Sequence, residues 1–447
     1  MFGVAQVAIL LGALFVMVFA GTHVAVALGL ASVLGIYLMQ GDMTVVRSFI
    51  ASTAYEALRD YVFAVIPLFM LMGDFLAKCG AAKDLFALVN RLTRRVPGRL
   101  AIATVLANAV FAFVTGVSIA AAAAFSRIAY PEMKRHGYER QFSVGCIAGS
   151  ACLGMLIPPS VLMIVWGVLT EQAIGKIFIA GIFPGFVLVA FYCAYILWVA
   201  ITRPERVGTG SSEAAAREAE TDDKELLPQL VSTLAVIALV LGTLGGIWLG
   251  VFTPTEGAGV GAAAALAIAI FKGMRAKALF EVILSVGRTS APLLLLLFCA
   301  QLYSRVLSMT GITGMAKEFF LGSGLGPWGV LAVMVGIWFI LGCIIDSISI
   351  ILLTVPVFAP VAMALGFDPL AFAILGILAI ETGLLTPPFG MLVFTVKAAL
   401  PHEGVSLAEI FRGSMPYWIC LLIVIVVIAA FPAIATWLPT VGTTLGR

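Results

Sequence analysis

Leu156-Ile-Pro-Pro-Ser160 interrupts one apolar run of the chain, and Leu385-Thr-Pro-Pro-Phe-Gly390 interrupts another 229 residues further on. The same offset relates four more pairs of residues, most of which disturb helices: Ser118 and Ser347, Pro131 and Pro360, Gly137 and Gly366, Gly154 and Gly383. Every proline between Ser118 and Ser160 therefore has a proline counterpart. These matched interruptions predict a duplicated unit with a broken helix in each copy. Such pairs are the best sequence pointer to the binding site of a membrane transporter.

The composition is that of a membrane protein. Hydrophobic residues make up 62% and charged residues 11% of the 447 residues, against roughly 45–50% and about 25% in soluble domains. Runs such as 182–201 and 230–251 reach the roughly 20 apolar residues that cross a bilayer. We expect an all-α polytopic protein in a lipid bilayer, with roughly ten to twelve spans plus short re-entrant pieces. The net charge of +3 gives no indication of nucleic-acid binding.

The N-terminal segment and the cysteines add two smaller expectations. The segment up to Met39 lacks the basic region of a secretory signal and is apolar throughout, so we expect two retained spans there. The seven cysteines form no CxxC pair, and most lie in apolar segments. We therefore expect them to be small core residues, and neither a disulfide framework nor a metal site.

Basic residues indicate which loops share a side of the membrane. They gather in four segments, at 78–99, 134–140, 203–224 and 272–277, which the positive-inside rule places in the cytoplasm. Loop 133–140 is strongly basic, whereas its counterpart 362–369 carries no lysine or arginine. This asymmetry favours two copies of opposite orientation over chance variation in loop charge. An inverted-topology repeat suits alternating access, because the copies can exchange roles across the membrane.

The expected domain organisation has six parts. They are scaffold helices at 1–60; a first repeat at 61–202, with a hairpin at about 100–133 and a broken helix at about 142–170; a cytoplasmic linker at 203–228; scaffold helices and an arm of the second repeat at 229–288; the transport part of the second repeat at 289–412, with a hairpin at about 330–361 and a broken helix at about 370–398; and a C-terminal span at 413–447. The linker is expected to be mobile, with a helical part.

Small and polar residues precede each break and suit the tip of a re-entrant hairpin. The first tip holds Gly116 and Ser118, and the second holds Asp346 and Ser347. A Pro-Pro break frees carbonyl oxygens, which in hydrocarbon must meet protein, water or an ion. Because sodium is a hard cation that prefers oxygen ligands, each tip with its break predicts a sodium site. Half-helix N-termini beside the breaks favour an anionic substrate; the alternative is that both breaks are mere kinks.

Ionisable residues in apolar segments are further candidates, and Glu381 is one of them, about one and a half helical turns before the second Pro-Pro break. Asp346 either binds a cation or stabilises its hairpin, and neither role is favoured. Glu256 follows Thr253-Pro-Thr255, and the favoured role is to cap the helix that it begins. Arg127 is a candidate substrate contact, although an arginine that extends to the membrane interface is the favoured interpretation.

At these motifs the chain resembles the large membrane subunit of tripartite ATP-independent periplasmic (TRAP) transporters. The resemblance covers essentially the whole length and rests on Thr115-Gly-Val-Ser118, Tyr130-Pro-Glu-Met133, Gly137-Tyr138, Leu156-Ile-Pro-Pro-Ser160, Gly250-Val-Phe-Thr-Pro-Thr-Glu256, Asp346 and Leu385-Thr-Pro-Pro-Phe-Gly390. It implies a sodium-coupled importer of small organic anions, such as C4-dicarboxylates or other carboxylates, in the bacterial inner membrane. A transport domain with two hairpins would move like an elevator against a scaffold. The implied partners are a small four-span membrane subunit and a periplasmic binding protein.

The resemblance also implies site residues. Sodium would be held near Gly116, Ser118, Pro158 and Ser160 in one copy, and near Asp346, Ser347, Thr386 and Pro387 in the other. Substrate would lie between the copies, against Ser118, Pro159, Ser160, Ser347 and Pro388, with Arg127 as a further candidate. The chain departs from the family pattern at Arg127, in the small-residue stretch of the hairpin, and at Glu381, where an amide is expected. These departures leave the substrate open.

Other function classes find less support. The sequence has no Walker A motif, so we expect neither ATP hydrolysis nor a cofactor other than sodium as the coupling ion. An intramembrane enzyme would need a His-Glu-x-x-His motif or paired aspartates in its spans, and the sequence has neither. A self-sufficient anion transporter or sodium/proton exchanger of related architecture stays open as the alternative.

Overall fold

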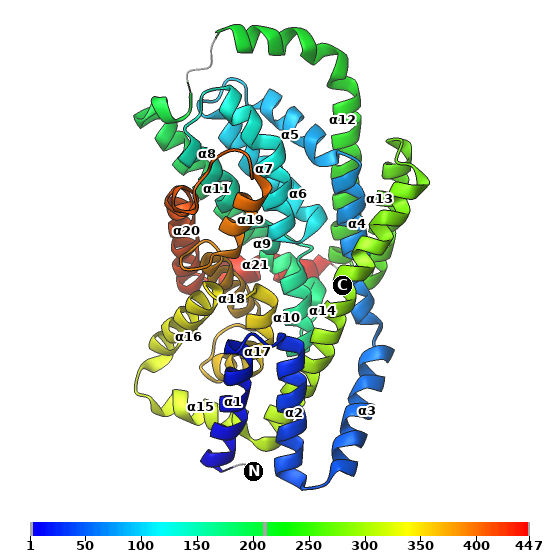
Figure 1. The fold of residues 1–447 in the computed structure, drawn as a ribbon, viewed down its shortest axis with the longest axis vertical. Helices are drawn as coiled ribbons and strands as arrows, with labels where there is room; N and C mark the ends of the chain where they lie inside the picture. Colours follow the sequence, from blue (N-terminus) through cyan, green and yellow to red (C-terminus); the bar gives the residue numbers. More distant parts are fainter. Residues whose placement is uncertain (1–2, 209–211, 446–447) are drawn as a thin grey trace.

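The computed structural model describes residues 3–208 and 212–445, and within these ranges every regular element is a helix (Figure 1). Eight described helical segments are long and apolar enough to cross a membrane, fewer than the ten to twelve spans expected. Five shorter apolar helices make up much of the difference, among them both helices of the N-terminal pair. The prediction of an all-α polytopic protein is confirmed.

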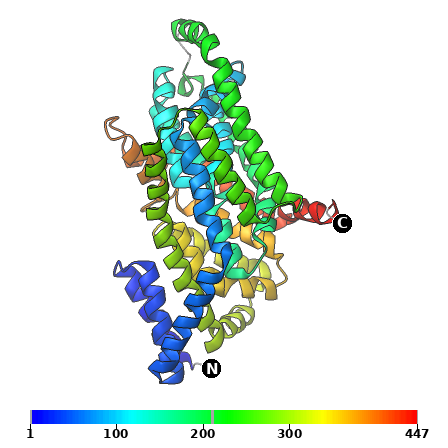
Figure 2. The same ribbon diagram turned by 90° about the vertical axis from the view of Figure 1, so that its right-hand side faces the viewer.

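Two groups of helices, at 4–92 and 212–322, precede the two hairpins in the sequence, and we call them the flanking helices. They extend beyond the expected scaffold at 1–60 and 229–288 into the expected repeats at 61–202 and 289–412, and the division into scaffold and repeats stays a prediction. The first group is α1 (Val4–Phe19), α2 (Val24–Gln40), α3 (Met43–Arg59), η1 (Tyr61–Ala64), α4 (Val65–Lys78) and α5 (Ala81–Leu92); the second is α12 (Ser212–Trp248), α13 (Pro254–Phe271), α14 (Ala276–Thr310) and α15 (Ile312–Gly322). The groups pack together, since α13 lies along α4 and α14 along α2. Figure 2 shows α4, α12, α13 and α14 side by side across one side of the molecule.

The duplicated units fold into similar series of elements, which differ by a short helix at 153–156 in copy one. Copy one contains α6 (Arg99–Thr115), α7 (Ser118–Arg135), α8 (Arg140–Ala151), α9 (Leu153–Leu156) and α10 (Val161–Thr170); copy two contains α16 (Gly326–Gly342), α17 (Ser347–Ala364), α18 (Pro369–Gly383) and α19 (Met391–Ala399). Both ends of α17 match those of α7 at the 229-residue offset, and α18 begins at the counterpart of the first residue of α8. The predicted hairpins and broken helices therefore lie within a few residues of the observed ones.

The two hairpins enter the middle of the molecule from opposite ends. In Figure 1, α6 and α7 lie in the upper half and α16 and α17 in the lower half. Asp346 caps α17, the second helix of its hairpin, by accepting a backbone N–H with its side chain, whereas α7 begins without a side-chain cap. Ser160 caps α10, the helix that follows the first Pro-Pro break, in the same way as Asp346. This arrangement is what an inverted repeat requires, and the orientation of each copy across the membrane stays a prediction.

The four basic segments gather at one end of the molecule. Arg206 pairs with Glu139 at 2.9 Å, which joins the segments at 203–224 and 134–140. Lys272 pairs with Asp84, which joins 272–277 to 78–99. These contacts agree with the expectation that the four segments face the same side.

Two boundaries differ from the expected ones. The polar segment at 203–228 is not a separate unit, because α12 begins at Ser212 and continues through Pro228 into a membrane span. Alanine and glutamate favour the helix there; the mobility of the segment stays a prediction, and residues 209–211 lie outside the described residues. The expected C-terminal span at 413–447 is α20 (Leu407–Ala430) followed by α21 (Ala433–Leu445), because Pro432 disfavours a helical conformation at the residue before it, and Phe431 has φ −128° and ψ 75°.

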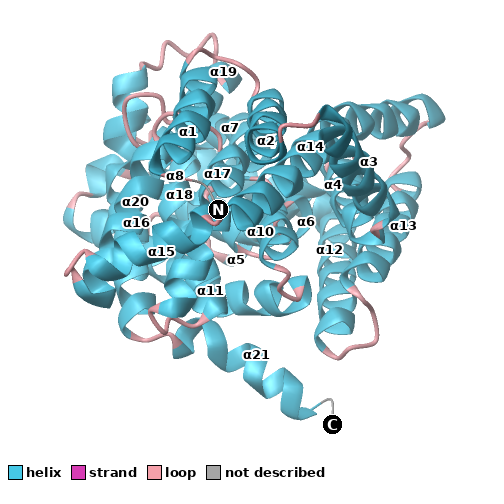
Figure 3. Cartoon of the chain, turned by 90° about the horizontal axis from the view of Figure 1, so that it is seen from below, coloured by secondary structure: helices cyan, strands magenta, loops and turns pink. Residues whose placement is uncertain are grey.

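The remaining elements, α11 (Ile174–Thr202) and η2 (Pro204–Arg206), connect copy one to α12. The helix α21 packs against α11 and then extends outward from the body of the molecule (Figure 3). The expected N-terminal pair of apolar segments is present as α1 and α2.

Candidate functional site

The tip of the first hairpin packs directly on the first Pro-Pro break. Gly116 ends α6 with a φ of +61°, and its carbonyl accepts the N–H of Val161 at 3.2 Å. A Cβ at Gly116 would lie 2.3 Å from the carbonyl oxygen of Pro159. Both the positive φ and this close approach require glycine at the tip.

The second hairpin meets its own break in a similar way. The carbonyl of Cys343 accepts the N–H of Phe389 at 3.2 Å, and the Cys343 thiol lies 3.3 Å from the hydroxyl of Thr386. Gly342 and Gly383 are in such close contact that a Cβ at Gly383 would lie 2.5 Å from the Gly342 Cα. The peptide bonds Pro158–Pro159 and Pro387–Pro388 are both cis.

The two tips meet at the side chain of Glu381. Ser118 of copy one donates a hydrogen bond to Glu381 Oε2 at 2.7 Å, and Ser347 of copy two donates to Oε1 at 3.4 Å. Glu381 is 1% exposed. Among the side chains that the structure describes, no lysine or arginine forms an ion pair with it. One buried carboxyl therefore bridges the two predicted sodium sites.

Copy one has a cysteine at the position that corresponds to Glu381 of copy two. Cys152 is the counterpart of Glu381 at the 229-residue offset, and its thiol lies 3.7 Å from the backbone carbonyl of Glu381. The two equivalent positions are thus in contact with each other. Sequence reasoning noted Glu381 as an ionisable residue in an apolar segment and as a departure from the family pattern, but it missed the contact with both serines. The 229-residue offset was a signal that could have paired Glu381 with Cys152.

Other predicted sodium-site residues have defined hydrogen bonds. The carboxylate of Asp346 accepts the N–H of Ser349 at 3.0 Å and its hydroxyl at 2.6 Å, which favours the hairpin-stabilising role. Ser160 is fully buried, and its hydroxyl accepts the N–H of Met163 at 3.5 Å. The Thr386 hydroxyl donates back to the end of α18, 2.9 Å from the carbonyl of Gly383.

The two breaks differ in exposure. The backbone segment that contains Pro158, Pro159 and Ser160 is buried, whereas Pro387 and Pro388 are exposed together with Phe389. The break of copy two therefore reaches the surface of the chain, whereas the break of copy one and the side chains of Ser347, Thr386 and Glu381 are buried.

Two ionisable residues lie apart from the tips. Arg127 is exposed and nine residues along α7 from Ser118, which is roughly 13 Å of helix, so the structure does not bring it together with the other candidates. Glu256 forms a capping box with Thr253: its carboxylate accepts the Thr253 N–H at 2.8 Å, and its own N–H donates to the Thr253 hydroxyl at 3.2 Å. The capping role predicted for Glu256 is confirmed.

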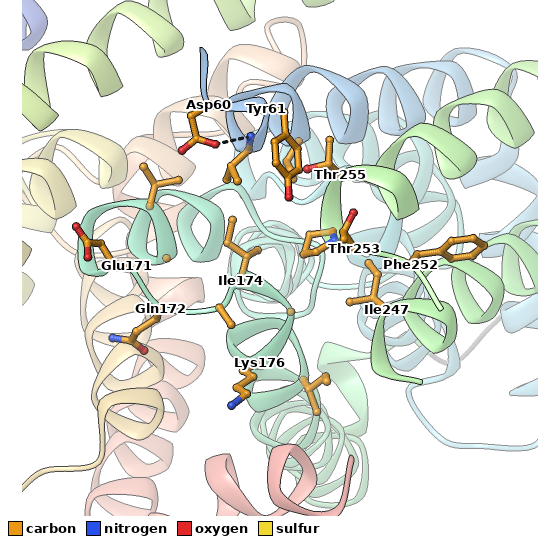
Figure 4. Close-up of a pocket in the computed structure, with 18 of the residues that line it drawn as sticks. Asp60, Tyr61, Glu171, Gln172, Ile174, Lys176, Ile247, Phe252, Thr253 and Thr255 are labelled. Carbon is orange, nitrogen blue, oxygen red and sulfur yellow. Dashed lines mark hydrogen bonds between the residues drawn. The ribbon is translucent and has the colours of Figure 1, made fainter. Parts of the chain in front are cut away.

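A separate cavity of about 700 Å³ lies between the flanking helices and copy one (Figure 4). Asp60 and Tyr61 line it before α4, Thr253 and Thr255 at the start of α13, and Lys176 at the start of α11. Neither hairpin tip and neither Pro-Pro break lines this cavity. It therefore adds no residue to the site at Glu381.

Two re-entrant hairpins that meet between paired helix breaks, in a polytopic helical protein, define the class of secondary membrane transporters. The particular family follows from comparison with known proteins. A family model described as "Tripartite ATP-independent periplasmic transporter, DctM component" matches residues 11–434. The chain belongs to this family and is a TRAP transporter large permease.

Relatives within the family differ in what their names say they carry. The chain is 34% identical to the C4-dicarboxylate TRAP transporter large permease protein DctM of Pseudomonas aeruginosa, over 92% of this chain and 93% of that protein. It is 31% identical to the ectoine/5-hydroxyectoine large permease protein UehC of Ruegeria pomeroyi, over 91% and 92%. It is also 26% identical to the sialic acid large permease protein SiaM of Vibrio cholerae, over 88% and 89%.

The fold has a relative among solved structures. The YdaH transporter of Alcanivorax borkumensis superposes with a TM-score of 0.59 at 15% identity, over 92% of this chain and 91% of that one. This likeness concerns the fold alone.

Proposed function

We propose that this chain is the permease subunit of a sodium-coupled importer of small organic anions, such as C4-dicarboxylates or other carboxylates. The observation that carries the proposal is the meeting of Ser118 and Ser347, one from each hairpin tip, at the buried carboxyl of Glu381. Equivalent residues from two halves enclose one central site. The relatives named for C4-dicarboxylates, ectoine and sialic acid support a small polar substrate.

Sodium would bind where each tip faces its break. The Ser118 hydroxyl donates its hydrogen to Glu381, which leaves its oxygen lone pairs free to bind a cation. Backbone carbonyls of the tip and of the break at Pro158 to Ser160 would complete an all-oxygen site of the kind that hard cations prefer. Ser347, Thr386 and the backbone at Pro387 would do the same in copy two.

An elevator motion would carry the two copies against the flanking helices. The copies pack on each other, with α10 on α17 and α19 on α7, while α4, α12, α13 and α14 form a layer of their own (Figure 2). The exposure of Pro387 and Pro388 beside a buried first break is the asymmetry expected of a state open to one side. In this proposal the flanking helices are the scaffold.

An ion gradient provides sufficient free energy. One charge crossing ~100 mV gains about 2.3 kcal/mol, and a tenfold concentration ratio adds about 1.4 kcal/mol. Two sodium ions would therefore supply roughly 7 kcal/mol per cycle, less the electrical work of carrying net negative charge inward. This is enough to concentrate a dicarboxylate strongly.

Uptake into proteoliposomes tests the proposal and separates it from the exchanger alternative. The chain would be reconstituted with and without its small membrane subunit and periplasmic binding protein, and uptake of radiolabelled succinate, ectoine and sialic acid measured. We expect uptake of one of them only with both partners and only under an inward sodium gradient. Uptake by the chain alone would favour a self-sufficient transporter, and uptake indifferent to sodium would refute the coupling.

A further inference from the structure

Among the residues that the structure describes, Glu381 is the one carboxyl that accepts from both hairpin tips, and copy one has no carboxyl at the equivalent position. Copy one carries Cys152 at the equivalent position, and the thiol brings no charge to the site. Ser118 and Ser347 must therefore share the acceptor, each through a different carboxyl oxygen. Two sites that share one acceptor are not independent of each other.

The two hydrogen bonds are unequal. The bond from Ser118 is 2.7 Å long, within the usual range for a hydroxyl donor, whereas the 3.4 Å bond from Ser347 lies beyond it. The carboxyl is thus well oriented toward copy one and incompletely oriented toward copy two. A change that fixes the carboxyl more firmly would also help to position Ser347.

A cation on the Ser118 oxygen would make such a change. It polarises the O–H group, and a more polar donor forms a stronger hydrogen bond to the carboxyl oxygen of Glu381. The carboxylate is then held with Oε1 directed at Ser347, whose hydroxyl oxygen is a candidate ligand of the second site. Sodium at the first site would order the side chains of Glu381 and Ser347. The second sodium ion would then lose less conformational entropy on binding, which gives positive cooperativity.

We infer that Glu381 couples the two candidate sodium sites, so that sodium at one hairpin tip favours sodium at the other. Glu381 acts in this as a positioning residue, through Ser118 and Ser347. The inference rests on the proposed sodium coupling and goes beyond it by making the order of binding cooperative. Its signature is the shape of the sodium-binding curve, which a purely structural role for Glu381 would leave unchanged.

Equilibrium binding of radioactive sodium to the purified full chain in lipid nanodiscs tests the inference without any organic substrate. Choline chloride holds the ionic strength constant. For the unaltered chain we expect a Hill coefficient approaching 2, the upper limit set by two sites. In Glu381→Gln an amide nitrogen, which cannot accept a hydrogen bond, replaces one carboxyl oxygen. For this variant we expect a Hill coefficient near 1.

Control variants separate coupling from general damage. Ser126→Ala removes another buried α7 hydroxyl, which donates to the Ala122 carbonyl of its own helix, and should keep the cooperative curve. Should Glu381→Gln fail to fold, as judged by its melting temperature, Glu381→Asp takes its place: it keeps both candidate sodium ligands Ser118 and Ser347 but shortens the shared carboxyl side chain by one methylene group, and it is expected to lower the Hill coefficient toward 1.

The outcomes divide cleanly between the two proposals. Equal Hill coefficients in the unaltered chain and in Glu381→Gln, or non-cooperative sodium binding in the unaltered chain, would overturn the coupling role while sodium-driven transport still stood. Absence of sodium binding in the unaltered chain would instead refute the proposed function itself.

Discussion

Ser118 donates a short hydrogen bond to a carboxyl that is almost wholly buried. We expect Ser118→Ala to cost about 1–3 kcal/mol of stability, because the carboxyl oxygen loses its partner where water cannot replace it. Ser126→Ala should cost less, since the carbonyl that accepts from Ser126 lies within the hydrogen-bonded helix α7. Melting temperatures of the two variants measure the difference. Equal temperatures would contradict the contact with Glu381.

Gly116 offers a second test at the scale of one residue. Gly116→Ala should destabilise the protein by roughly 3 kcal/mol or more, because strain at a positive φ is combined with a clash against a backbone carbonyl. Gly366→Ala is the matched control: its φ is also positive, at +83°, but a Cβ there meets nothing within 4 Å. Denaturation of both variants in mixed micelles gives the comparison. Similar losses would show that the tip does not press on Pro159.

The sequence revealed only part of this site. Ser118 and Ser347 stood out because the repeat matched them, and because small and polar residues suit a hairpin tip. The link through Glu381 could not be predicted, because Ser118 and Glu381 are 263 residues apart and their contact depends on how the copies pack. Arg127 stood out by its charge alone, and a charge does not tell which face of α7 it occupies.

At the scale of the element, the start of α17 decides between the two roles of Asp346. Asp346→Asn keeps a side-chain oxygen for the cap, so stability should hold, whereas Asp346→Ala should lose about 1 kcal/mol. Sodium binding by Asp346→Asn should match that of the unaltered chain if the carboxylate only caps the helix. Weaker sodium binding with unchanged melting temperature would assign the carboxylate to the sodium site instead.

Helix boundaries were predictable where breakers and caps set them. The matched starts of α7 and α17 follow from glycine, serine and aspartate at the tips, and those of α8 and α18 follow from the turns after each hairpin. The start of α12 was not predictable, because a polar segment rich in alanine and glutamate is typical of both a linker and a helix. The end of α20 was missed because an apolar run hides the effect of Pro432.

At the scale of the whole molecule, the unequal exposure of the two breaks predicts a one-sided pattern of labelling. In a background that lacks the half-buried thiols Cys79 and Cys193, Phe389→Cys should react with a membrane-impermeant maleimide and Ile157→Cys should not. The reason is that Phe389 is exposed and Ile157 is 1% exposed. Labelling of sealed vesicles of each orientation identifies the open side. Equal reactivity of the two positions would contradict a state that is open at one break only.

Composition predicted the membrane fold, and basic loops predicted which ends lie together, as the pairs Arg206–Glu139 and Lys272–Asp84 illustrate. The cavity in Figure 4 had no such signal, because its walls come from segments far apart in the chain. Its position between the flanking helices and copy one became visible only with the packing of α10 and α11.

The central claim is that each hairpin tip, together with its break, holds sodium on either side of Glu381. Electron cryo-microscopy of the full chain in sodium chloride and in choline chloride tests it most directly. The account predicts two extra densities in sodium, one among the oxygens of Gly116, Ser118 and Ser160 and one among those of Ser347 and Thr386. Identical maps in the two salts, or sodium density only at a distance from both tips, would contradict it.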